Sequence, residues 1–410
     1  MPYSRLLLST GAAPRPLPLP GADLPGVQYL RQIGDSDALR AAITTASRVV
    51  VIGAGWIGSE VAASARQLGA EVAIVAPEAV PLERVLGPEV GGIYRDLHAE
   101  NGVDLHLSTR IEAIVGNGAA QGVRTTDGSV IEGDLVVVGA GVSPRDELAR
   151  DAGRTLENGI VVDELLRTSA PDVFAAGDVA ATWNTGYNKR IRMEHWANAL
   201  NQGQAAARNM LGRDTAYTKL PYFYSDQYDL GMEYNGYATD WDRVILRSGT
   251  SAREFIAFWL KDGRVLAGMN ANVWDQGDDI KALIRGTRSS DDRRSASPLV
   301  RVGRCASASA PHRARENNMI ALIASAIFVG AIIGGLGRLV VRGKQDISLA
   351  MTAAIGIVAA LIGTFIANAL GVGSTTGIDW IKLMIQVGLA AIGVTLYTGG
   401  GRSRGRSRRR

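Results

Sequence analysis

The segment RVVVIGAGWIGSE constrains the fold of this chain more than any other part of the sequence. Its first half, RVVVI, is a continuous apolar run of the kind found in buried parallel strands. Its second half opens an alanine-rich helical pattern. Between the two, Gly53, Gly55 and Gly58 fit the pattern G-x-G-x-x-G in the required strand-to-helix context. The sequence therefore predicts a parallel α/β unit with a dinucleotide-binding turn.

Each glycine of this turn has a separate physical task. Gly53 permits the tight turn, Gly55 lets the backbone approach a pyrophosphate, and Gly58 lets the helix pack closely on the sheet. Exposed amides and the positive end of the helix then hold the pyrophosphate. The predicted nucleotide site consists of Gly53, Ala54, Gly55, Trp56, Ile57 and Gly58.

The choice of nucleotide depends on the end of the second strand, which we predict at Glu71–Val75. An acidic residue there would bind the ribose 2′-hydroxyl. Ala76 occupies that position, and Glu78 follows two residues later, where it serves either as the ribose ligand or as a solvated loop residue. The nearest arginine is Arg84. NADH is therefore favoured over NADPH, without being fixed.

Composition limits the remaining chemistry. The formal net charge of the 410 residues is +4, and six arginines among the last ten residues account for more than all of it, so the rest of the chain is not a polyanion binder by charge. The only cysteine is Cys305, which excludes an intrachain disulfide and a redox-active cysteine pair. No cluster of metal ligands is apparent, and no metal site is predicted.

The chain changes character twice after the first α/β unit. Further strands are predicted at Leu135–Val138 and Val173–Ala175, and aromatic alternating segments after Leu220 indicate a small mixed or antiparallel domain. Residues 286–318 are rich in arginine and serine without apolar periodicity, which predicts a disordered linker.

Three uncharged apolar runs follow: Met319–Gly337, Ile347–Ile378 and Leu383–Gly401. Each can supply close to twenty residues, about the length that crosses a bilayer core. They predict a multi-pass membrane protein with three transmembrane helices and the lipid bilayer as a partner. The arginine tail would contact anionic headgroups rather than nucleic acid, because no aromatic stacking residues are interleaved with it.

Residues 4–285 resemble the FAD-dependent pyridine-nucleotide oxidoreductases, in the ferredoxin and rubredoxin reductase branch related to apoptosis-inducing factor. The segments that carry the resemblance are SRLLLSTGAAPR, VVVIGAGWIGSEVA, GDLVVVGAGVSPR, TSAPDVFAAGDVA, EHWANALNQGQAAA and PYFYSDQYDLGMEYNG. It implies that FAD and NAD(P)H are the cofactors. It also implies that electrons pass from NAD(P)H through FAD to a ferredoxin- or rubredoxin-like iron–sulfur carrier.

The resemblance assigns further residues. It implies that Gly177 and Asp178 bind the ribityl and pyrophosphate region of FAD and that Thr10 and Gly11 border the flavin; Asp178 has a helix cap as its alternative role. Gly139 and Gly141 would line the NAD site. The catalytic candidates are Glu60, near the nicotinamide, and Trp196, near the flavin ring, with core packing as an equal alternative for Trp196.

Such enzymes carry two dinucleotide turns, and this chain begins at the strand that should follow the first. We therefore expect an N-terminally truncated reductase with weakened FAD binding, and hence an inactive enzyme. The predicted fold is α/β, with a Rossmann-like domain inserted in a partial FAD-binding domain. The expected parts are a partial FAD-binding domain (1–22 and 145–213), an NAD(P)-binding Rossmann domain (23–144), a reductase C-terminal domain (214–285), the linker (286–318), a three-helix membrane domain (319–400) and a basic tail (401–410).

Residues 319–399 resemble the small transglycosylase-associated membrane proteins linked to stress responses. The basic loop around Arg342 and the basic tail should face the cytoplasm, which would place the reductase opposite cytosolic NADH unless the linker charges invert the bundle. The reductase is nevertheless expected at the cytoplasmic side, where NADH is found. This conflict between the two predicted orientations favours a fusion of neighbouring genes. The alternative function is a stress-related integral membrane protein fused to an inert or merely NAD-binding reductase fragment.

Overall fold

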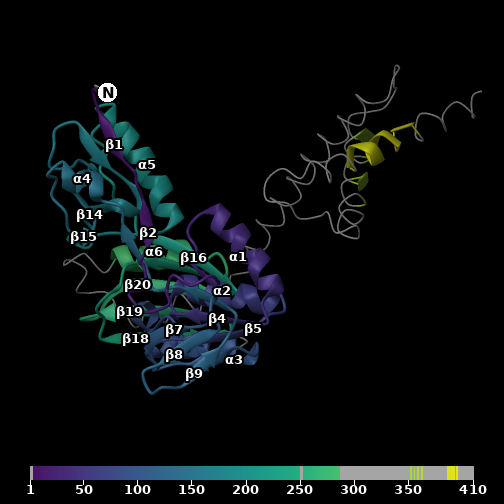
Figure 1. The fold of residues 1–410 in the computed structure, drawn as a ribbon. Helices are drawn as coiled ribbons and strands as arrows, with labels where there is room; N and C mark the ends of the chain where they lie inside the picture. The colour runs from purple at the N-terminus through teal and green to yellow at the C-terminus, as the bar shows by residue number, and fades with distance from the viewer. Residues whose placement is uncertain are drawn as a thin grey trace, which may run out of the picture. The chain divides into compact units, whose positions relative to one another are not determined.

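The computed structural model describes residues 3–249 and 253–286, together with helical residues at 351–352, 355, 358–359, 362, 386–392 and 394–395. The chain divides into two compact units, Met1–Ala306 and Ser307–Arg410. All the named helices and strands lie in the first unit (Figure 1).

A five-stranded parallel sheet forms the centre of the first α/β part. Its strand order is β3-β10-β4-β5-β6, so β10 returns from far along the chain to pair with β4. The strands are β3 (Val27–Gln28), β10 (Leu135–Val138), β4 (Arg48–Ile52), β5 (Glu71–Val75) and β6 (Asp104–His106), and the accompanying helices are α1 (Ile33–Thr45), α2 (Trp56–Gln67) and α3 (Glu83–Glu100). The predicted strands at Glu71–Val75 and Leu135–Val138 are confirmed to the residue.

Both faces of this sheet are buried at its central strands, which explains why β4, β5 and β10 are almost continuously apolar. Val49 and Val51 of β4 pack with Val61 and Ala62 of α2, whereas Val50 and Ile52 point to the opposite face. The opposite face is covered by an antiparallel sheet of β7 (Ile111–Val115), β8 (Gly122–Thr125) and β9 (Val130–Glu132). The two-residue period of a strand thus divides one apolar run between two hydrophobic cores.

A second part joins the start of the chain to residues beyond the parallel sheet. Strand β1 pairs in parallel with β13, with Leu6 opposite Val173, and β2 pairs with β11. The elements are β1 (Leu6–Leu8), β2 (Ala12–Pro14), β11 (Val142–Pro144), α4 (Glu147–Asp151), β12 (Ile160–Val162), β13 (Val173–Ala175), the 3-10 helix η1 (Gly177–Val179), β14 (Ala180–Asn184), β15 (Lys189–Ile191) and α5 (Trp196–Met210). The parallel-sheet part is therefore inserted between two pieces of this one.

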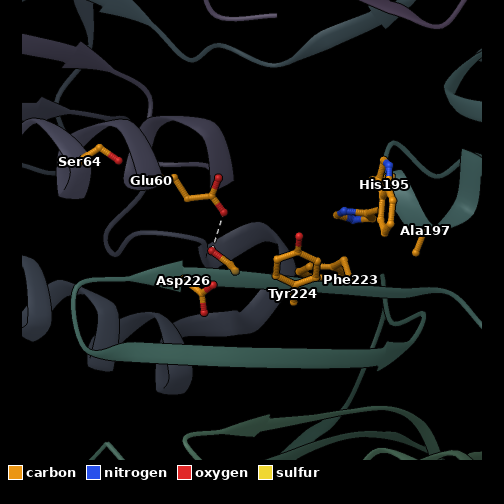
Figure 2. Close-up of a pocket in the computed structure, with 9 residues that line it drawn as sticks. Glu60, Ser64, His195, Ala197, Phe223, Tyr224 and Asp226 are labelled. Carbon is orange, nitrogen blue, oxygen red and sulfur yellow. Dashed lines mark hydrogen bonds between the residues drawn. The ribbon is translucent and has the colours of Figure 1, made fainter. Parts of the chain in front are cut away.

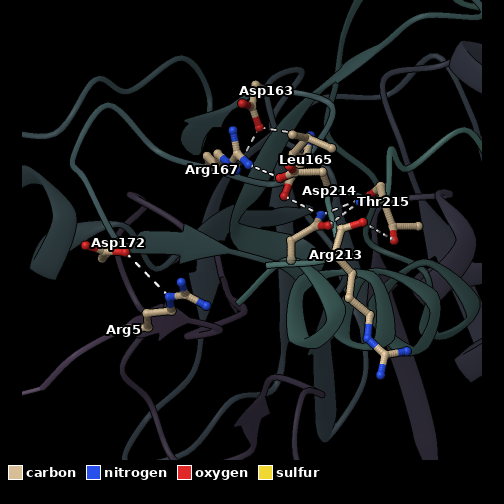
Figure 3. Close-up of polar contacts among 9 residues, drawn as sticks. Arg5, Asp163, Leu165, Arg167, Asp172, Arg213, Asp214 and Thr215 are labelled. Atoms are coloured by element: carbon tan, nitrogen blue, oxygen red, sulfur yellow. Dashed lines mark hydrogen bonds and ion pairs between the residues drawn. The ribbon is translucent and has the colours of Figure 1, made fainter. Parts of the chain in front are cut away.

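Polar contacts fasten the end of α5 to the loop before β13 (Figure 3). Asp163 accepts backbone hydrogen bonds from Leu165 and Arg167 at 2.9 and 2.8 Å. The Arg167 guanidinium pairs with Asp214 just beyond the helix. The start of the chain is tied to the same part by the ion pair between Arg5 and Asp172, at 3.5 Å.

The third part is an antiparallel sheet in the order β16-β17-β20-β19-β18, as the aromatic alternation predicts. Its elements are β16 (Tyr222–Gln227), β17 (Leu230–Gly236), β18 (Arg243–Ser248), β19 (Phe255–Lys261), β20 (Arg264–Ala271) and α6 (Gly277–Gly286). One face packs on α3, where the fully buried Trp259 donates its indole N–H to the carbonyl oxygen of Leu86 at 3.1 Å. Ile280 and Ile284 of α6 cover the other face.

The predicted membrane localisation is corrected here. Within the part of the chain that the structure describes, no helix combines the length and the apolar character needed to cross a bilayer. The predicted linker lies outside the described residues, as do the basic tail and most of the three predicted spans.

Candidate active site

The glycine turn closes through backbone contacts that leave no room for a side chain at two positions. Gly53 has φ +100°, and a Cβ atom there would lie 2.7 Å from the carbonyl oxygen of Gly139. A Cβ on Gly58 would lie 2.0 Å from the carbonyl oxygen of Gly53. Helix α2 therefore begins in direct backbone contact with β4, as the motif predicts.

The other two glycines of the region face open space. A Cβ on Gly55, the N-cap of α2, or on Gly141 would meet no atom within 4 Å. The first amides of a helix have no partner within the helix, and its N-terminus favours negative charge. The space in front of Gly55 is thus shaped and polarised for a diphosphate, and the residues present fit a bound dinucleotide there.

A long groove begins at this turn. It has a volume of about 1080 Å³, and residues from all three parts of the first unit line it. Gly53, Gly55, Gly139 and Gly141 lie along it, and so do Glu60, His195 and Phe223. The groove therefore brings the predicted nucleotide residues together with one of the two catalytic candidates.

Glu78 lies on the wall of the groove. The sequence had left open whether this residue binds the ribose or is a solvated loop residue. Its carboxylate is mostly buried and pairs with the exposed guanidinium of Arg84 at 2.8 Å. The backbone carbonyl of Glu78 accepts a hydrogen bond from Ser108 at 2.8 Å, which holds the loop against the groove. Glu78 is therefore a fixed wall residue rather than a freely solvated loop residue.

Glu60 projects from α2 toward strand β16 (Figure 2). One of its carboxylate oxygens accepts a hydrogen bond of 2.6 Å from the Ser225 hydroxyl. Burial raises the pKa of Glu60, the Ser225 hydrogen bond opposes that rise, and the nearby Asp226 charge adds to it. A carboxyl group whose pKa is shifted by burial and by specific neighbours in a groove is typical of functional sites.

His195 is the N-cap residue of α5 and lies beside Phe223 (Figure 2). Trp196 is the first residue of the helix and lines the same hollow as Glu60. Trp196 is 72% exposed, so its alternative role as a core residue is wrong. It borders a smaller hollow of about 410 Å³ that shares Glu60, His195 and Phe223 with the long groove. The His195 ring stacks on Phe223 with centroids 4.1 Å apart, and burial lowers its pKa to about 4, so it is neutral at pH 7.

The predicted flavin-binding residues meet around one ion pair. Asp178, in η1, is buried and pairs with Arg31 at 2.6 Å, so its alternative role as a helix cap is wrong. A Cβ on Gly11 would lie 3.5 Å from the same guanidinium. Gly177 takes φ +80° and donates its backbone N–H to Gln202 at 2.8 Å, and Thr10 is bonded to the Arg145 carbonyl.

Three site residues escape sequence reasoning: Arg31, Arg192 and Ser225. Arg192 is almost fully buried; it donates to the Asp178 carbonyl at 3.1 Å and pairs with Glu194, while its buried Nε atom has no partner among the described residues. Arg31 and Asp178 are 147 positions apart, so no local pattern relates them. The orphan Nε and the Arg31–Asp178 pair fit a polar cofactor such as the flavin on this wall.

The fold and the groove are those of an α/β protein with a dinucleotide-binding turn. The family described as pyridine nucleotide-disulphide oxidoreductase matches residues 1–203, and the reductase C-terminal family matches residues 222–306. Rhodocoxin reductase of Rhodococcus erythropolis is 40% identical, over 66% of this chain and 64% of its own length. The ferredoxin–NAD(+) reductase component of the anthranilate 1,2-dioxygenase system of Burkholderia cepacia is 37% identical, over 73% of this chain and 74% of its own.

A solved structure supports the same assignment. The covalent putidaredoxin reductase–putidaredoxin complex matches with a TM-score of 0.67 and 34% identity, over 73% of this chain and 72% of that one. The chain belongs to the pyridine nucleotide-disulphide oxidoreductase family, among its ferredoxin reductases, as the sequence motifs predict. FAD and NAD(P)H are the cofactors of this family.

The comparisons do not support every earlier expectation. They do not support the predicted N-terminal truncation, the expected inactivity of the enzyme or the gene fusion. They also give no support to the alternative function as a stress-related membrane protein or to the predicted family of the tail. The chain spans about two thirds of the length of the relatives it matches.

Proposed function

We propose that this chain is an NAD(P)H-dependent flavoprotein reductase that passes electrons to a ferredoxin-type iron–sulfur carrier. The observation that supports it best is the long groove, which is lined by Gly55 of the glycine turn, by Glu60 and by the stacked pair of His195 and Phe223. A dinucleotide laid along this groove has its diphosphate at the helix N-terminus and its nicotinamide beside Glu60. Arg31 and Arg192 line the same groove, and both are bonded to Asp178.

In this assignment a bound FAD would supply the chemistry that links two-electron transfer from NAD(P)H to one-electron transfer to the carrier. The residues of this chain bind and orient. Gly53 and Gly58 hold the turn in shape, Gly55 and Gly141 leave room for the diphosphate, and Arg31 with Arg192 would face the flavin wall. Glu60 would lie beside the nicotinamide, and the exposed Trp196 near the flavin edge.

We further propose that NADH is preferred over NADPH. The Glu78 carboxylate on the groove wall can accept hydrogen bonds from a ribose 2′-hydroxyl, whereas a 2′-phosphate would meet its negative charge. Arg84 is already paired with Glu78 and is largely in solvent, which leaves it less available to a phosphate.

The test is reconstitution of the full chain with FAD, followed by an anaerobic titration with NADH. We expect bleaching of the flavin absorbance by NADH and subsequent reduction of an added plant- or bacterial-type [2Fe–2S] ferredoxin. Gly55→Ala is the matched control, because its methyl group enters the diphosphate space without touching protein atoms. Absence of any NADH affinity in the wild-type chain would refute the proposal.

A further inference from the structure

A hydrogen-bonded network of four buried or half-buried side chains connects helix α3 to Glu60. The His98 Nδ1 atom lies 3.2 Å from the Tyr228 hydroxyl, and its Nε2 atom lies 3.1 Å from the Gln227 Oε1 atom. The Gln227 amide nitrogen lies 3.4 Å from the Ser225 hydroxyl, which donates to Glu60 at 2.6 Å. His98 and Gln227 have no exposed surface, and Ser225 has 3%.

The hydrogen bonds of this network are satisfied by one consistent set of directions. The Oε1 atom of an amide only accepts, so His98 must donate from Nε2. A neutral ring then accepts at Nδ1, which makes Tyr228 the donor at that end. Burial lowers the pKa of His98 to about 4, in agreement with a neutral ring. Gln227 donates to Ser225, whose only hydrogen is directed at Glu60.

We infer that His98 and Gln227 are positioning residues that act through Ser225 to hold the Glu60 carboxylate in one orientation and in its ionised form. The inference rests on the proposed function in one respect, that Glu60 lies beside the bound nicotinamide. The remaining steps depend only on the hydrogen bonds between α2, α3 and β16.

The surroundings of Glu60 make such a donor necessary. The groups that face it are Ser225 and Asp226 from β16, Tyr94 from α3 and His195 at the start of α5. Asp226 and burial both favour the protonated form, and His195 is neutral at pH 7. Ser225 is the donor that opposes them, and its hydroxyl can also rotate. The Gln227 amide behind it prevents the hydroxyl hydrogen from turning away.

The first measurement is the tautomer of His98 in the wild-type chain by ¹⁵N NMR, which is practical because the chain has four histidines. The Nε2–H form is expected. The Nδ1–H form would reverse the first two hydrogen bonds and overturn the inference without any substitution.

The second measurement is the titration of Glu60 by infrared spectroscopy of the full chain with ¹³C-labelled glutamate. Ser225→Ala should raise the pKa of Glu60 by about one unit, because a hydrogen bond to a charged group is lost. His98→Leu should raise it by a smaller amount, and His98→Gln, which keeps a donor, should return it to the wild-type value. His106→Gln changes a partly buried histidine that is bonded to Asp104, outside this network, and should have no effect.

A wild-type titration in His98→Leu, in a variant that remains folded, would overturn the inference, as would failure of His98→Gln to rescue. The titration needs no nucleotide, so it is independent of whether NADH binds. If NADH does bind, the pH dependence of its dissociation constant in Ser225→Ala should be shifted by the same amount as the pKa of Glu60.

Discussion

Replacing Gly58 with alanine tests the close contact between α2 and β4. The new Cβ would lie 2.0 Å from the Gly53 carbonyl oxygen and 3.3 Å from the Val51 side chain, so the backbone must move by about 1 Å to relieve the first contact. Overpacking of this kind costs about 1–3 kcal/mol. The higher helix propensity of alanine returns at most about 1 kcal/mol. The clash outweighs the propensity, so the variant should be less stable.

The assay is thermal unfolding of the full chain with and without NADH. A net loss of about 1–2 kcal/mol corresponds to a decrease in Tm of roughly 2–8 °C. Gly92→Ala is the matched control, because Gly92 lies within α3 and its Cβ would meet no atom within 4 Å. That variant should be unchanged or slightly stabilised. A Gly58→Ala chain as stable as wild type would refute the packing argument for this turn.

Three further changes probe other parts of the molecule. Glu78→Ala should weaken NADH binding about tenfold, because hydrogen bonds to a charged group are lost. The preference for NADH over NADPH should become smaller. An equal loss of affinity for both nucleotides in a fluorescence titration would contradict the ribose assignment. Histidine has an unfolded pKa of about 6.5 and that of His98 is about 4 in the folded chain. The contribution of His98 to stability is therefore constant above pH 6.5 and should fall by about 3 kcal/mol on acidification toward pH 4. His195, whose pKa is also lowered to about 4, adds to the fall of the wild-type chain. The His98 contribution is therefore measured by urea unfolding as the difference in pH dependence between the wild type and His98→Gln, which should have the shallower slope. Trp259→Ala should cost about 4 kcal/mol, whereas Trp274→Ala, at a side chain 53% exposed, should cost under about 1 kcal/mol.

Much of the first α/β part could be predicted because its signals are local. The apolar run of β4, the glycines at 53–58 and the start of α2 are neighbours in sequence and in space. β5 and β10 were predicted to the residue from short apolar runs, one beginning at Glu71 and the other lying between Asp134 and Gly139. The membrane localisation was predicted from apolar composition alone, and within the described residues no helix is long and apolar enough to cross a bilayer.

The sequence by itself determined that a glycine turn would join a buried strand to a helix, since only glycine tolerates the backbone contacts at Gly53 and Gly58. Only the tertiary structure decided which distant residues would face that turn. Ser225 lies 165 positions from Glu60, and Arg31 lies 147 from Asp178, yet both pairs are 2.6 Å apart. Such pairs form because strands and helices far apart in the chain bury a common core, and no local periodicity encodes which polar side chains that core brings together.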